Sequence, residues 1–329
     1  MAFFSYLVDP LWCYSHSNRF NLKQEPIDDR QLKTNYLTFG NRAYDTLIIG
    51  NSRVEMMDQN DFGKNAFNYA TGGMAPKEYG EYISYAAKAN GRPFARIIMG
   101  MSFVHSNEKL GYITGNPPSH YFDTSNKPFY RYVSLFGADV FRHAWSNAKH
   151  SHERKTNMYF DRGNVFRVQR ENLNYDKLMP PRLKEARDSY RDYKYLAELK
   201  QILRDIRKAN PDSRMNIFTP PVAKPLFCAM VEEGKLDDYE RWLRDLVEVS
   251  GEVHHFEYLN SVTRDSGGNF FDGSHYYPEI GKVMAHFIMG SPDVERPPDF
   301  GILLNKANID AQLEVIRKSA EECTTAQGV

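Results

Sequence analysis

Two short apolar runs, each ended by a glycine, constrain the fold of this chain more than any other feature of its sequence. The first is Asp45-Thr-Leu-Ile-Ile-Gly50, and the second is Ala95-Arg-Ile-Ile-Met-Gly100. Both have the length of a strand, and an unbroken apolar pattern is typical of a strand that is buried on both faces. We therefore expect both runs to be central strands of a sheet covered by helices on either side.

Further strands and helices alternate along the chain. Strand patterns recur at residues 66–69, 215–219 and 253–258, and apolar stripes with helical spacing lie at 76–90, 196–206, 239–246 and 280–288. Such alternation predicts an α/β fold in which helices wrap a parallel sheet. The predicted architecture is a three-layer α/β/α sandwich with a parallel central sheet, similar to the flavodoxin fold.

Three segments do not follow this alternation. Residues 101–187 carry no sustained period, and we interpret them as a large irregular insertion after the third strand that caps the carboxyl edge of the sheet. Residues 291–329 form a tail with a short helix and a polar end that frays. Residues 1–44 form an N-terminal arm, which leaves an α/β domain at 45–290.

The overall composition limits the classes of partner. Lysine plus arginine and aspartate plus glutamate number 42 each, so no net charge attracts nucleic acid or an anionic membrane. The hydrophobic share of 41% supports a buried core, and aromatic residues reach 14%. Tyrosine-rich loops suit the stacking of sugar rings, but an aromatic core with tyrosines at the surface explains the same composition.

The cysteines and the N-terminus leave the compartment open. Cys13, Cys228 and Cys323 are far apart and odd in number, which indicates neither a disulfide framework nor a CxxC site. No apolar run is long enough to span a bilayer. The apolar start, residues 1–8, has two interpretations: the remnant of a signal anchor, or an ordinary first strand or hydrophobic arm.

A serine follows the first central strand. In Gly50-Asn51-Ser52-Arg53 the hydroxyl group lies in the turn at the carboxyl edge of the sheet, where open α/β sheets bind ligands. Alone, this sequence is also ordinary turn chemistry.

A second motif, Asp272-Gly-Ser-His275, precedes the last helix of the predicted domain. A carboxylate three residues before an imidazole in a tight turn can accept its Nδ1–H and leave Nε2 free to take a proton. The alternative is an Asx turn that caps a helix, with a histidine facing solvent. Because Ser52 follows the first strand and the motif follows the last, both reach one edge of the sheet.

Together these motifs resemble the SGNH (GDSL-like) hydrolase family, over about residues 45–100 and 195–290. The resemblance implies a catalytic triad of Ser52, Asp272 and His275, and an oxyanion hole made by the N–H groups of Ser52 and of Gly72 or Gly73. The Gly-x-Asn-Asp block that the family carries after its third strand is replaced by Gly100-Met-Ser-Phe103. This departure resembles a divergent branch of cell-envelope polysaccharide O-acylation proteins.

Several other residues are candidates for contact with a substrate. They are Arg53, Asn68, Ser102 and His105; Ser102 and Asn68 are the possible substitutes for the missing asparagine donor. The basic and aromatic stretch from Arg142 to Arg170 suits an acidic glycan or is simply a solvated face. We expect no cofactor and no metal site, because the histidines of this stretch lack carboxylates or cysteines at ligand spacing.

The resemblance implies a serine ester hydrolase or O-acyltransferase that acts on an acylated polysaccharide or cell-envelope glycan through an acyl-enzyme on Ser52. An esterase for small or lipid esters and a catalytically silent glycan-binding protein are the alternatives. The implied location is extracytoplasmic or periplasmic, with a membrane contact only through a missing N-terminal anchor and a membrane O-acyltransferase as a partner. A cytoplasmic location is the alternative.

Overall fold

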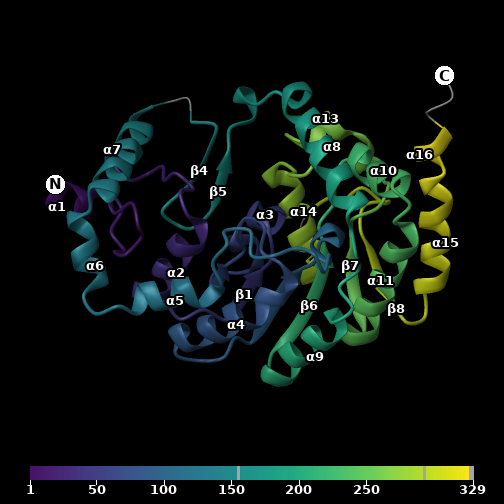
Figure 1. Ribbon diagram of the computed structural model, residues 1–329, viewed down its shortest axis with the longest axis horizontal. Coiled ribbons are helices and arrows are strands. Elements are labelled where there is room, and N and C mark those ends of the chain that lie inside the picture. Colours follow the sequence, from purple (N-terminus) through teal and green to yellow (C-terminus); the bar gives the residue numbers. More distant parts are fainter. Residues whose placement is uncertain (154–155, 292–293, 326–329) are drawn as a thin grey trace.

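A six-stranded sheet forms the centre of the protein, with helices on both of its faces (Figure 1). The computed structural model describes residues 1–153, 156–291 and 294–325. The strand order is β2-β1-β3-β6-β7-β8, and neighbouring strands are parallel except at β8. The strands are β1 (Thr46–Ile49), β2 (Ala66–Asn68), β3 (Arg96–Gly100), β6 (Arg214–Thr219), β7 (Glu252–His255) and β8 (Ile302–Asn305). This confirms the predicted three-layer α/β/α fold.

Strand β1 illustrates why the apolar runs are unbroken. Leu47 and Ile49 join one core cluster, whereas Ile48 between them joins a second cluster on the opposite face. Successive side chains of a strand point to opposite faces, so both faces need apolar residues. The first cluster packs under α4 (Pro76–Asn90), α9 (Leu199–Ala209) and α11 (Leu236–Ser250), and the second packs under α14 (Pro278–Met289).

The C-terminal segment contains the predicted short helix, but it also adds a strand to the sheet. The sequence pattern predicts only a tail there, and a sheet whose strands are parallel. Strand β8 pairs antiparallel with β7, and its Leu304 is fully buried. Helix α15 (Ile309–Ala320) then packs on α11 through buried Leu313 and Ile316. The run that forms β8 is only four residues long, so it has little periodicity of its own. Residues 326–329, where we expect fraying, lie outside the described residues.

The N-terminal residues are helical, which excludes the predicted first strand. Helix α1 (Ala2–Val8) packs against α7 (Ala138–His152), and Val8 is fully buried there. Helix α2 (Asp29–Phe39) contributes Leu32 and Leu37 to the two core clusters. Residues from Asp29 onward therefore pack within the domain instead of forming an arm outside it.

The predicted insertion after the third strand, residues 101–187, is present, but it consists of helices and one hairpin and is not irregular. Its elements are η2 (Phe103–His105), α5 (Pro118–Asn126), α6 (Tyr130–Val133), η3 (Ser134–Phe136), α7, the hairpin of β4 (Met158–Phe160) and β5 (Phe166–Val168), η4 (Arg170–Asn172) and α8 (Tyr175–Arg191). Its two long helices lie far apart: α7 is beside α1, whereas α8 packs against α10 (Lys224–Glu232) on the other side of the molecule (Figure 1).

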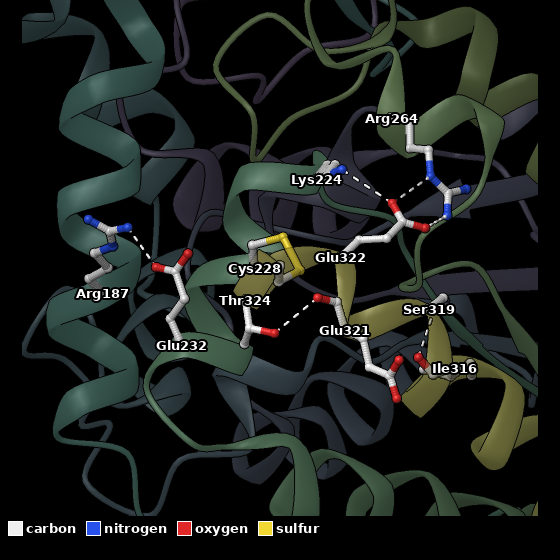
Figure 2. Close-up of a disulfide and its surroundings, with 11 residues drawn as sticks. Arg187, Lys224, Cys228, Glu232, Arg264, Ile316, Ser319, Glu321, Glu322 and Thr324 are labelled. Atoms are coloured by element: carbon white, nitrogen blue, oxygen red, sulfur yellow. Dashed lines mark hydrogen bonds and ion pairs between the residues drawn. A yellow bond between two sulfur atoms is a disulfide. The ribbon is translucent and has the colours of Figure 1, made fainter. Parts of the chain in front are cut away.

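A disulfide between Cys228 and Cys323 joins α10 to the last helix, α16 (Glu322–Thr325) (Figure 2). Next to it, Lys224 and Arg264 both contact the carboxylate of Glu322. Cys13 is buried as a free thiol. The prediction that the cysteines form no disulfide is therefore wrong, because two cysteines 95 residues apart carry no local signal of their pairing.

Short helices complete the carboxyl side of the sheet. They are α3 (Ser52–Glu55), η1 (Gln59–Phe62), α12 (Ser261–Arg264) and α13 (Ser266–Asn269). Among the described residues, none of the helices combines the length and the apolar character that crossing a bilayer requires.

Candidate active site

Ser52 is the first residue of α3, directly beyond the end of β1. Asn51 caps this helix, because its Oδ1 accepts a hydrogen bond of 3.0 Å from the backbone N–H of Arg53. Ser52 itself is half-buried, and none of the described residues accepts a hydrogen bond from its backbone N–H. The first N–H groups of a helix have no partner within the helix, so this donor is available to a ligand.

The two glycines of the strand patterns allow α3 to lie this close to the sheet. A Cβ atom on Gly50 would lie 2.3 Å from Val54 Cγ2, and one on Gly100 would lie 2.1 Å from the same atom. Any larger residue at either position would push α3 away from the strand ends. The glycines that end β1 and β3 therefore position the serine.

The Asp272 carboxylate shapes the second motif with one oxygen and orients His275 with the other. Oδ1 accepts hydrogen bonds from the backbone N–H groups of Ser274 and His275, at 2.9 and 2.8 Å. Oδ2 lies 2.8 Å from His275 Nδ1. Gly273 has a positive φ of 81°, and a Cβ there would lie 2.2 Å from Met179 Sδ, so the turn requires glycine.

The three residues of the predicted triad form one chain of hydrogen bonds. His275 Nε2 lies 2.8 Å from Ser52 Oγ, and the imidazole is only 11% exposed. The turn at Asp272 is an Asx turn, as in the alternative interpretation, but the histidine faces the serine and not the solvent. With Nδ1–H directed to the carboxylate, Nε2 can accept the hydroxyl proton.

Arg182 on α8 also binds the carboxylate that orients His275. Its Nε donates to Asp272 Oδ2 over 3.0 Å. Burial alone would raise the pKa of Asp272, but the hydrogen bonds and charge of His275, together with the Arg182 charge, hold it well below its usual value. Asp272 therefore stays ionised. Arg182 was not predicted, because it lies in a segment without a sequence period.

Arg53 lies beneath the site instead of facing a substrate, which corrects its assignment as a substrate-binding candidate. It is 5% exposed, its Nε donates to Ser274 Oγ over 3.3 Å, and its Nη1 lies 3.8 Å from Glu257 Oε1. Burial raises the pKa of Glu257 to about 7, although the Arg53 charge and the N–H of Phe103 oppose this shift. Arg53 thus links the serine helix to the histidine turn.

The predicted oxyanion donors are only partly free. The N–H of Gly72 donates to the Asp29 carboxylate over 2.5 Å, so the assignment of Gly72 as a donor is wrong in this structure. No hydrogen bond involves the N–H of Gly73 among the described residues, but the Ile113 side chain lies over this glycine. The Ser52 N–H and the Gly73 N–H therefore remain as backbone donors.

Neither proposed substitute for the missing asparagine faces the site. Asn68 is 1% exposed, and its Nδ2 donates to the carbonyls of Val54 and Met57, both over 3.0 Å. Ser102 is equally buried, and its hydroxyl accepts a hydrogen bond from Asn51 Nδ2 over 2.8 Å. Both side chains are almost fully buried and form hydrogen bonds within the turns around the sheet edge.

His105, on η2 beyond the end of β3, is the remaining candidate. Its Nδ1 lies 3.0 Å from Asn51 Nδ2. Burial lowers the pKa of His105 to about 3, and the charges of Arg53 and His275 add to this effect. The imidazole is therefore neutral near pH 7. Asn51 was not predicted as a functional residue, although its position directly before the serine suits a helix cap.

A wide groove lies next to α8, the helix that carries Arg182. It has a volume of about 550 Å³ and lies between α8 and the loop that follows His105. Lys109, Lys184, Glu185 and Asp188 line it together with Asn107, Leu110, Pro181, Ser189 and Asp192. Ser52, Asp272 and His275 do not line this groove, but Pro181, which does, directly precedes Arg182. The charged residues of the lining can bind a polar ligand.

The described residues contain no group of three or more potential ligands that could hold a metal ion. In the basic stretch, His150 instead pairs with Glu25 over 3.0 Å. The arrangement of Ser52, His275 and Asp272 needs no metal to activate a hydroxyl group. None of the models of known protein families matches this chain, and no curated protein is similar to it in sequence.

Proposed function

We propose that this chain is an SGNH-type serine hydrolase or O-acyltransferase that acts on an acylated glycan. The observation that carries the proposal is the hydrogen-bonded chain from Asp272 through His275 to Ser52. The imidazole takes the hydroxyl proton while Ser52 Oγ attacks an ester carbonyl, and Asp272 stabilises the imidazolium that results. His275 then returns the proton to the leaving alcohol, which produces an acyl-enzyme on Ser52.

The fate of the acyl group depends on the acceptor. Water gives hydrolysis, and a sugar hydroxyl that displaces water gives transfer. The groove along α8 supports a carbohydrate over a lipid ester, because most of its lining residues are charged or polar and can form hydrogen bonds with sugar hydroxyls.

The Cys228–Cys323 disulfide supports an extracytoplasmic location for this activity. Disulfides persist in secreted and periplasmic proteins and are rare in a reducing cytosol. A membrane O-acyltransferase is a suitable partner there, since it supplies acyl groups at the same surface.

A catalytically silent glycan-binding protein is the second candidate, and one contact favours it. The Asp29 carboxylate occupies the Gly72 N–H and places negative charge near the oxyanion donors. An oxyanion gains most of its stabilisation from such donors, so this contact opposes catalysis unless other donors are present.

A fluorophosphonate probe separates the two candidates. The active enzyme forms a covalent adduct at Ser52, and labelling disappears in Ser52→Ala. Ser84→Ala, on the exposed face of α4, is the matched control and labels like the wild type. Absence of labelling in the wild type contradicts the proposed activity and supports the silent protein. Acetate release from peracetylated cellobiose, with and without a free cellobiose acceptor, then distinguishes hydrolysis from transfer.

A further inference from the structure

The side-chain amide of Asn51 has only one possible orientation. Its Oδ1 accepts the N–H of Arg53, so the amide nitrogen must be the atom that faces Ser102 and His105. Asn51 is fully buried, which leaves it no alternative partner in solvent. Exchanging its oxygen and nitrogen would place two donors against each other at the helix cap.

This orientation determines the tautomer of His105. An amide NH2 group only donates hydrogen bonds, so the Nδ1 atom that it contacts must carry a lone pair. The ring is neutral, because burial, aided by the nearby Arg53 charge, lowers the pKa of His105 to about 3. A neutral imidazole with an unprotonated Nδ1 carries its proton on Nε2.

The Nε2–H of His105 is an unused donor at the sheet edge. No described residue accepts a hydrogen bond from it, and it is not among the buried polar atoms without a partner, so this atom is not fully buried. His105 follows β3, which pairs directly with β1, the strand that leads to Ser52. Asn51, its hydrogen-bond partner, is the residue immediately before the serine.

We propose that His105 is a catalytic residue whose Nε2–H stabilises the oxyanion formed when Ser52 attacks an ester, with Asn51 as the positioning residue. This inference rests on the proposed function. The serine proton passes to His275, the carbonyl oxygen becomes the oxyanion, and His105 keeps its own proton throughout. The site then has a side-chain donor beside the backbone N–H groups of Ser52 and Gly73, although Gly72 is occupied.

The experiment measures the rate of fluorophosphonate labelling in His105→Phe and His105→Gln. Phenylalanine retains the shape of the ring without a donor, and removal of one oxyanion donor typically costs about 100- to 1,000-fold in rate. We expect a loss of this size in His105→Phe and a partial recovery in His105→Gln, whose amide nitrogen can reach the same place. His120→Phe, on α5, is the control and retains the wild-type rate.

A second measurement does not depend on activity. The ¹⁵N chemical shifts of His105 in the wild-type protein report which ring nitrogen carries the proton, and we expect Nε2. In Asn51→Asp one carboxylate oxygen can still cap the helix. The other oxygen replaces the amide nitrogen beside His105 Nδ1 and can only accept a hydrogen bond, so we expect the ring proton of His105 to move from Nε2 to Nδ1. A proton on Nδ1 in the wild type overturns the proposal even if the variants fail to fold.

The outcomes separate the two proposals. If the wild type labels at Ser52 and folded His105→Phe labels equally fast, the role of His105 is wrong and the hydrolase proposal stands. If the wild type does not label at all, the hydrolase proposal fails and the role of His105 fails with it.

Discussion

The hydroxyl group of Tyr276 donates a hydrogen bond of 2.5 Å to the backbone carbonyl of Arg53, across 223 positions of sequence. Tyr276 follows His275 directly, and Arg53 follows Ser52 directly. Both residues are buried. This bond therefore joins the two segments of the proposed active site one residue beyond the groups that exchange a proton.

Tyr276→Phe tests this connection. The substitution leaves the Arg53 carbonyl buried without its partner, which costs about 1–3 kcal/mol. We expect a lower free energy of unfolding in urea and slower fluorophosphonate labelling, because the distance from Ser52 to His275 is less restrained. Tyr277→Phe is the matched control, since no hydrogen bond of its hydroxyl group is found among the described residues. Equal effects of both substitutions would contradict a specific role of Tyr276.

Arg182 offers a test of the electrostatics around the base. Its charge helps to lower the pKa of Asp272, and the same positive charge opposes protonation of the neighbouring imidazole. Arg182→Met removes this opposition, so we expect the midpoint of the pH–labelling profile to move upward. Because Arg182 is 39% exposed, the shift is roughly 0.2–0.7 pH units, equivalent to about 0.2–1 kcal/mol.

The control for Arg182 lies on the same helix. Arg187, further along α8, pairs with Glu232 and has no contact with the triad among the described residues. Arg187→Met leaves the midpoint unchanged. A downward shift in Arg182→Met would mean that Arg182 acts mainly by holding Asp272 in place.

Glu257 makes stability depend on pH in a definite direction. Its pKa is about 7 in the folded chain and 4.5 as the reference value, so the folded state binds more protons between these limits. The free energy of unfolding therefore falls as pH rises from 4.5 to 7. Glu257→Gln has no carboxyl group to titrate, so its free energy of unfolding does not fall for this reason. The difference between its free energy of unfolding and that of the wild type should therefore rise by up to about 3 kcal/mol between pH 4.5 and 7.

Urea unfolding at several pH values measures this difference, in which the titrations common to both proteins cancel. Glu252→Gln, at an exposed position of β7, is the control and shows no such trend. A relative stability of Glu257→Gln that falls with pH would show that the attraction of Arg53 exceeds the effect of burial.

The core of the fold and the alignment of the triad were predictable because local patterns carry them. The glycine-ended runs identify central strands, and parallel strands bring their carboxyl ends to one edge. Ser52 follows β1, and His275 lies between the end of β7 and α14, so the topology brings both to the carboxyl edge of the sheet. The distance of 2.8 Å between Ser52 Oγ and His275 Nε2 depends on how Val54 packs against the strand ends and on the turn at Gly273. A sequence pattern carries no information on this packing.

Other features could not be predicted because they depend on contacts between distant segments. The Asp29 carboxylate reaches Gly72 from α2, within a segment that has no strand or site pattern. Residues 302–305 form strand β8 because their backbone pairs with the edge of β7, and their own sequence shows no strand pattern. His105 was a candidate, but the state of its ring depends on the burial and orientation of Asn51. In each case the tertiary partner decides the role of the residue.

The pairing of Cys228 with Cys323 predicts the number of reactive thiols in each state of the chain. Cys13 is buried, and burial raises the pKa of its thiol, so the native protein should react slowly or not at all with a thiol reagent. Denaturation without a reductant should expose one thiol, and denaturation with a reductant should expose three. In Cys13→Ser the unreduced, denatured chain should have none.

The same disulfide should contribute to stability, because it closes a loop of 95 residues in the unfolded chain. Disulfides typically contribute about 2–4 kcal/mol, mainly by restricting the unfolded ensemble, and longer loops contribute more. We expect the double variant Cys228→Ser/Cys323→Ser to unfold at lower urea concentration and to lose its response to reductant, while Cys13→Ser keeps that response. Because neither cysteine forms a hydrogen bond with Ser52, Asp272 or His275 among the described residues, labelling of the folded double variant should match the wild type. Three reactive thiols in the denatured, unreduced wild type would contradict the pairing.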